Sequence, residues 1–94
     1  MLPTLDYAFF AERLHGFFAV AGHDGVTLTL TQVDRAAHQA PGGNSFSLLF
    51  RGPAQPQLEQ MTYMLDIPGS ATFPLFIVPV GRDQDGMQYQ AIFN

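Results

Sequence analysis

Nine residues near the C-terminus, Thr72 to Val80 (TFPLFIVPV), are apolar on both faces of any strand that they form. Successive side chains of a strand point to opposite sides. The two faces consist of Phe73, Leu75 and Ile77 on one side and of Phe76, Val78 and Val80 on the other. A small domain covers one such face with its own core and the other with further core or another molecule. We therefore expect the second face to lie under the N-terminal helix or to form a partner interface.

Two prolines limit where this strand can lie in a sheet. Pro74 and Pro79 lack a backbone N–H donor, and their spacing of five residues places the missing donors on opposite sides. At least one of them should therefore mark a sheet edge, a strand end or a bulge. Protection of an exposed edge is the structural interpretation, and docking of a partner beside the prolines is the functional one.

The length of 94 residues predicts a single domain, residues 1–94, with one small core. Charged residues make up 13% of the chain, while hydrophobic residues reach 47% and lysine is absent. The charged share is about half of the average for soluble domains, so neutral side chains must cover much of the surface. Such a surface offers little electrostatic repulsion against self-association.

The charge and the N-terminus exclude several classes of protein. A net charge of −4, with four scattered arginines, provides no basic stripe for nucleic acid. The absence of cysteine excludes a disulfide framework and cysteine-ligated metal. We expect no signal peptide, because acidic residues occur early and no basic start precedes an apolar run. No apolar stretch approaches the length of a membrane span, and we expect a cytoplasmic protein.

The first regular element is a short amphipathic helix. Apolar residues recur at helical spacing over residues 5–14. Thr4 precedes this segment as the expected N-cap, and Gly16 follows it as the expected stop.

After the helix the apolar period changes to two, which is typical of strands. The pattern predicts six of them, over residues 17–20, 26–31, 46–50, 61–67, 72–80 and 87–93. Turn residues separate the strands, and residues 35–44, with a proline and two adjacent glycines, are expected to form a loop. The fold class is therefore α+β, mainly β: a six-stranded antiparallel meander forming a small barrel or rolled sheet with one N-terminal helix. A two-layer sandwich is the alternative.

Two pairs of adjacent phenylalanines, Phe9-Phe10 and Phe17-Phe18, add to the candidate surface. Neighbouring residues of a helix or strand cannot both face the same core, so one member of each pair is expected at a second contact surface. We take Phe10 and Phe18 as candidates for partner contact, together with the outward face of the strand over residues 72–80.

Residues that could support chemistry are few. The histidines His15, His23 and His38 are separated by eight and fifteen residues, which matches no zinc motif. The segment 83–86 (DQDG) begins like a calcium loop, but the later acidic ligands are missing, and a hairpin turn explains its residues. The serines lie in no nucleophile motif. We expect no catalytic residues, no metal, no cofactor and no small-molecule substrate.

Three segments together resemble a known family. They are residues 46–53 (FSLLFRGP), 75–81 (LFIVPVG) and 89–94 (YQAIFN). With the N-terminal helix and the first hairpin, they resemble a family of small bacterial proteins classed as a domain of unknown function. Its members look like accessory proteins often encoded near phage-tail-collar-like proteins, which implies a structural or assembly role without catalytic residues. Within the first segment, Arg51 is either a clamp on the following turn or a contact for a carboxylate.

We expect a non-enzymatic structural or interaction domain, an assembly or accessory protein that acts through its apolar strand surface and can self-associate. The first alternative is a carrier of a small apolar, lipid-like ligand, with some of the nine phenylalanines lining a cavity. Six short strands, however, enclose little beyond their own side chains. The second alternative is a hydrolase, which requires a histidine in a cleft beside a carboxylate.

Overall fold

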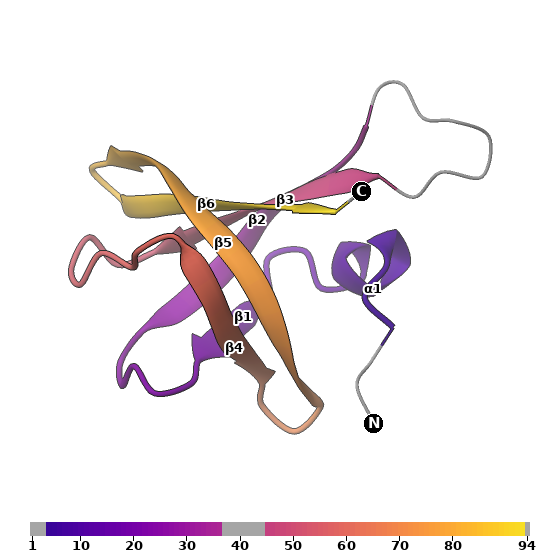
Figure 1. Cartoon of the computed structure of the whole chain (residues 1–94), viewed down its shortest axis with the longest axis horizontal. Helices are drawn as coiled ribbons and strands as arrows, with labels where there is room; N and C mark the ends of the chain where they lie inside the picture. The colour runs from indigo at the N-terminus through magenta and orange to yellow at the C-terminus, as the bar shows by residue number, and fades with distance from the viewer. Residues whose placement is uncertain (1–3, 37–44, 94) are drawn as a thin grey trace.

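A computed structural model describes residues 4–36 and 45–93 and contains six strands and one short helix in this part of the chain (Figure 1). The elements are α1 (Tyr7–Ala11), β1 (Phe17–Val20), β2 (Thr27–Arg35), β3 (Phe46–Gly52), β4 (Met61–Ile67), β5 (Ala71–Asp83) and β6 (Gly86–Phe93). Every pairing between strands is antiparallel. The predicted α+β class with a mainly β architecture is confirmed. Most of the predicted loop over residues 35–44 lies outside the described residues.

The strands form a closed sheet in the order β1-β2-β3-β6-β5-β4. The sheet closes where β4 pairs with β1, through Ala19 opposite Asp66 and Val20 opposite Leu65. This closure excludes the two-layer sandwich. It also departs from a simple meander at one connection, because β4 follows β3 in the sequence but lies beside β1. The chain thus crosses one end of the barrel over residues 53–60, and β4, β1, β2 and β3 lie in Greek-key order.

The helix is shorter than the sequence predicts and has a different cap. Asp6, not Thr4, is the N-cap, since its Oδ1 accepts a hydrogen bond of 2.8 Å from the backbone N–H of Phe9. Aspartate caps helices at least as well as threonine. The stop also differs, because His15, not Gly16, has a positive φ of 71°. The backbone N–H of His15 donates to the Leu30 carbonyl over 2.7 Å, which ties the end of the helical segment to β2.

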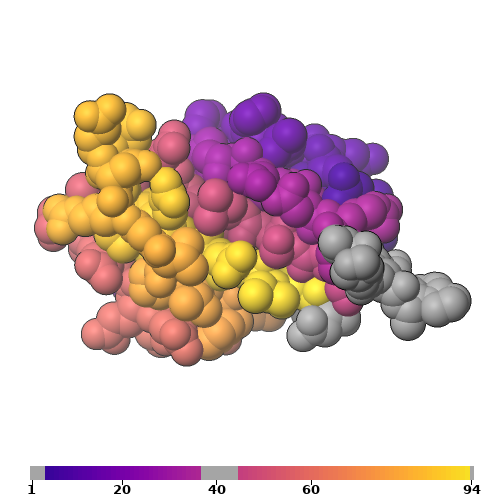
Figure 2. Space-filling view, turned by 90° about the horizontal axis from the view of Figure 1, so that it is seen from above, coloured from indigo at the N-terminus to yellow at the C-terminus, as the bar shows by residue number. Residues whose placement is uncertain are grey.

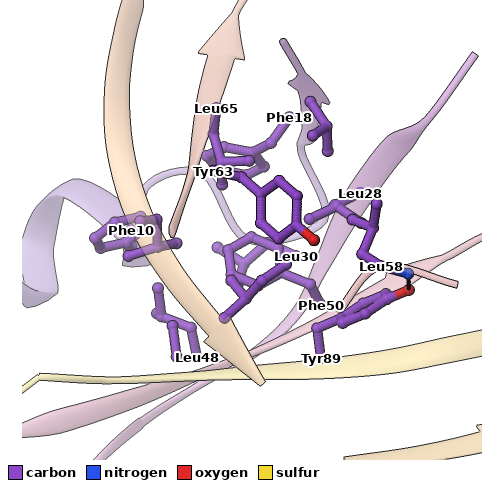
Figure 3. Packing of buried hydrophobic residues seen from close by; sticks show 14 of the residues in the cluster. Phe10, Phe18, Leu28, Leu30, Leu48, Phe50, Leu58, Tyr63, Leu65 and Tyr89 are labelled. Atoms are coloured by element: carbon purple, nitrogen blue, oxygen red, sulfur yellow. Dashed lines mark hydrogen bonds between the residues drawn. The ribbon is translucent and has the colours of Figure 1, made fainter. Parts of the chain in front are cut away.

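One end of the barrel is filled by Phe10, which α1 directs into the interior (Figures 1 and 3). The side chain of Phe10 is fully buried. Its ring centroid lies 5.0–6.5 Å from those of Phe9, Phe18, Phe46, Phe73 and Phe93. These aromatic contacts join the helix to strands from both halves of the chain.

The opposite end is filled by the connection between β3 and β4. Leu58 from this connection is 3% exposed and packs with the core. Its backbone N–H donates a 2.8 Å hydrogen bond to the hydroxyl of Tyr89, a fully buried residue of β6, as the dashed line in Figure 3 shows. Residues 53–60, predicted as a linker, therefore act as a plug.

Replacing Phe10 by alanine tests the first of these plugs. We expect Phe10→Ala to lower the free energy of unfolding by about 3–5 kcal/mol, because it leaves a cavity among packed aromatic rings. The matched control is Phe17→Ala, whose side chain is 66% exposed and whose loss should cost no more than about 0.5 kcal/mol. Urea denaturation followed by circular dichroism measures both. Equal losses for the two variants would contradict the role assigned to Phe10.

The β5–β6 turn meets the second plug at Gly86. This residue has a φ of 132°, and a Cβ there would lie 2.1 Å from the Gly52 carbonyl oxygen. Gly69 has a φ of 75° but open space around it. We expect Gly69→Ala to cost about 1–2 kcal/mol from its backbone conformation alone and Gly86→Ala to cost clearly more. Thermal or chemical unfolding of the two variants gives the comparison, which similar losses would refute.

Candidate functional site

The apolar strand singled out in the sequence is β5, and it changes its neighbour halfway along. Residues 71–77 pair with β4, and residues 78–83 pair with β6. Each half thus has one hydrogen-bonded neighbour strand, with Pro74 in the first half and Pro79 in the second. The register shifts between Pro79 and Gly81, so Pro79 borders a bulge. This confirms that at least one proline marks an irregular position.

The two faces of β5 have opposite environments. Phe73, Leu75 and Ile77 are buried inside the barrel, as predicted. On the outer face, Phe76 and Val80 are each 50% exposed, and Val78 is half-buried. The helix does not cover Phe76, because α1 occupies the end of the barrel and directs Phe10 inward (Figure 1).

A methionine from β4 extends this outer face. Met64 is 42% exposed and lies opposite Pro74, while Thr62 lies opposite Phe76. Met64 and Phe76 are therefore diagonal neighbours, a relation in which Cα atoms are about 7–8 Å apart and large side chains touch. We call Met64, Phe76, Val78 and Val80 the β5 outer surface. The sequence analysis missed Met64, although its alternation with the inward residues of β4 already places it outside.

The structure corrects the choice within the two phenylalanine pairs. Phe10 and Phe18 are 0% and 1% exposed, so both belong to the core and neither is available to a partner. Their neighbours lie nearer the surface: Phe17 is exposed, and Phe9 is half-buried under the Arg13 guanidinium, 4.0 Å from the ring centre. The reason is that Phe10 and Phe18 face each other across the filled end of the barrel.

The histidines and acids do not assemble into a reactive centre in the part of the chain that the structure describes. His15 and His23 are exposed, and His38 lies outside that part. No cluster of three potential metal ligands occurs among residues 4–36 and 45–93. Asp83 accepts hydrogen bonds of 2.8 Å from the Asp85 backbone N–H and from the Gln88 side chain. These bonds explain the DQDG segment as a hairpin turn.

The interior of the barrel is filled by apolar side chains (Figure 3). A shallow depression of about 230 Å³ lies instead on the outside, beside the ends of β3 and β6. Phe46, Ile92 and Phe93 contribute apolar surface to it, and Ser47 and Gln90 contribute polar groups. Ligand pockets generally begin near 300 Å³ and enclose most of their ligand, so this feature offers little to a lipid-like molecule.

Tyr63 is a titratable side chain whose surroundings change its pKa. Burial in the barrel raises the pKa of the Tyr63 phenol above its ordinary value of 10.0, and the nearby Glu59 carboxylate adds to this rise. The hydroxyl donates a 2.8 Å hydrogen bond to the Glu59 carbonyl, which acts in the opposite direction. The His23 ring packs edge-on against the Tyr63 ring, with centroids 5.5 Å apart.

These observations define a small closed β domain with a filled interior and an exposed apolar strand face. The family described as a domain of unknown function (DUF6916) matches residues 5–93, and the chain belongs to this family. The resemblance inferred from the sequence is thereby confirmed at the level of a domain of unknown function. No curated protein and no solved structure matches the chain. Residues 4–36 and 45–93 include no helix with the length and apolar character of a membrane span.

The raised pKa of Tyr63 predicts a loss of stability in alkaline solution. Below pH 10 the phenol is neutral in both states, so it adds no pH dependence. As the pH rises past 10.0, the unfolded chain ionises Tyr63 more readily than the folded protein, and the free energy of unfolding falls. Urea denaturation between about pH 9 and pH 11 should show a shallower fall for Tyr63→Phe than for the wild type. Parallel pH profiles for the two proteins would rule out this role of Tyr63.

Proposed function

We propose that this protein is a non-enzymatic interaction domain that binds protein through the β5 outer surface. The supporting observation is the exposed pair of Phe76 and Met64, adjacent on two hydrogen-bonded strands. Aromatic residues and methionine are enriched in protein interfaces, where large or adaptable side chains contribute most of the contact. An exposed pair of this kind in a domain of this size favours a binding surface.

The neighbourhood of the β5 outer surface suits contact with a second copy of the chain. The outward positions of β5 from Thr72 to Val80 carry no charged residue, and the chain as a whole has few charges. Two such surfaces can therefore meet without burying unpaired charges. Self-association through this surface is the form of binding that we propose to test first.

An assembly role accounts for these properties together. In this proposal the protein is a bacterial, cytoplasmic accessory subunit that acts near phage-tail-like structures. The resemblance to proteins encoded near phage-tail-collar-like proteins supports it, as does the small rigid scaffold. Catalysis plays no part in the proposal, since the exposed positions of His15 and His23 offer no cleft beside a carboxylate.

The carrier and hydrolase alternatives find less support. A lipid carrier needs an interior space, whereas the interior of this barrel is occupied by side chains such as Phe50 and Tyr89. A hydrolase needs a histidine aligned with an acid, and the nearest ring partner of His23 is the phenol of Tyr63. Neither alternative explains why Phe76 and Met64 are exposed.

Replacing Phe76 by threonine tests the proposal, because threonine keeps the preference for strand while removing the ring. We expect the wild-type mass in sedimentation equilibrium to rise with protein concentration and the Phe76→Thr variant to stay close to the monomer. The physical reason is the loss of apolar area, worth about 25 cal/mol for each Å² removed from contact. Since Phe76 is half exposed, the folded state should keep its stability.

The matched control is Phe17→Thr, which removes an equally large exposed ring from β1. This variant should associate like the wild type. A wild-type protein that stays monomeric at every concentration would contradict self-association, and equal effects of the two substitutions would show that the β5 outer surface is not the contact.

A further inference from the structure

A second feature of the outer face lies around Arg51, in the middle of β3. Arg51 is opposite Thr29 of β2 and opposite Gln88 of β6, and Thr29 is in turn opposite Phe17 of β1. The row therefore runs across four adjacent strands and has Phe17, with 66% of its surface exposed, at one end. Figure 2 shows the face on which the bands of β2, β3 and β6 follow one another in magenta, pink and yellow.

The guanidinium of Arg51 has no partner within the described residues. Its Nε is shielded from solvent and makes no hydrogen bond. Among residues 4–36 and 45–93, the one ion pair joins Arg13 to Glu12 and does not involve Arg51. The clamp on the following turn, which the sequence left open for Arg51, is therefore not formed by hydrogen bonds. A buried donor without a partner is rare in folded proteins, because burial removes its water.

We propose that Arg51 binds a carboxylate side chain presented by a partner protein, with the Phe17 ring as the apolar contact beside it. A guanidinium offers its donors as a planar fork that matches a carboxylate in two parallel hydrogen bonds. Arginine and large aromatic residues are also the side chains that concentrate binding energy in interfaces. The site goes beyond the proposed β5 contact, because it lies on β1, β2, β3 and β6.

A carboxylate fits this site better than a phosphate. The row from Phe17 through Thr29 and Arg51 to Gln88 contains one cation, and the chain carries a net charge of −4. A single arginine can balance a singly charged carboxylate, whereas phosphate sites in proteins gather several cations or backbone donors.

A foreign protein is a better source of the carboxylate than a second copy of this chain. Several of its own carboxylates already accept hydrogen bonds within the fold. They include those of Asp6, Asp34, Asp66 and Asp83. The partner must also bind through side chains, because β3 is paired on both sides, with β2 and β6, and offers no free strand edge.

Selection of peptides from a random display library on the immobilised wild-type protein tests this inference. We expect the selected peptides to share an aspartate or glutamate next to an apolar residue. Their binding, measured by fluorescence anisotropy, should weaken at least about tenfold with Arg51→Gln, since hydrogen bonds to charged groups are worth about 1.5–3 kcal/mol. Arg51→Lys should also bind more weakly, because lysine keeps the charge but loses the fork.

The control with the same change of charge is Arg82→Gln, at an exposed position of β5, which should bind like the wild type. Phe17→Thr should weaken peptide binding and Phe76→Thr should not, the reverse of their effects on self-association. Changing the peptide acid to its amide tests the same contact without altering the protein, should Arg51→Gln prove unstable. Peptides without an acid, equal binding to Arg51→Gln and Arg82→Gln, or no selected peptide would each overturn the proposal.

Discussion

The packing of Phe10 inside one end of the barrel is the contact on which the rest of the structure depends. Its ring touches aromatic rings from α1, β1, β3, β5 and β6. A small barrel has little interior, so a single large side chain at an open end removes much apolar surface from water. This packing also decides the place of the helix. Because α1 fills the end of the barrel, it leaves the outer face of β5 uncovered.

Closure of the sheet shapes how this protein can bind others. A barrel leaves few free strand edges, so addition of a partner strand is restricted and contact falls to side chains on the outer face. Two groups of side chains there remain without partners in the fold: the apolar β5 outer surface and the Arg51 guanidinium beside Phe17. They differ in chemistry, since one is apolar and uncharged and the other is cationic. An assembly subunit needs separate contacts of this kind to join more than one neighbour.

Local pattern predicted much of the fold and part of the candidate site. Alternation of apolar residues located all six strands, and it placed Phe73, Leu75 and Ile77 inside and Phe76 outside. The pattern was ambiguous at Phe17-Phe18, because a shift of one residue exchanges the two faces of a strand. It also could not show that Leu58, in a segment rich in proline and glutamine, plugs the barrel. That role depends on a hydrogen bond to Tyr89, a residue distant in the sequence.

The sequence by itself determined the β class, the positions of the strands and the apolar character of both faces of β5, since these follow from periodicity and composition along the chain. Only the tertiary structure decided that β4 returns to β1, that Phe10 and Phe18 are core, and that Phe76 and Arg51 lack partners. The physical reason is that alternation is a local property of a strand. Which residue covers a face or pairs a charge depends on segments that meet only when the sheet closes.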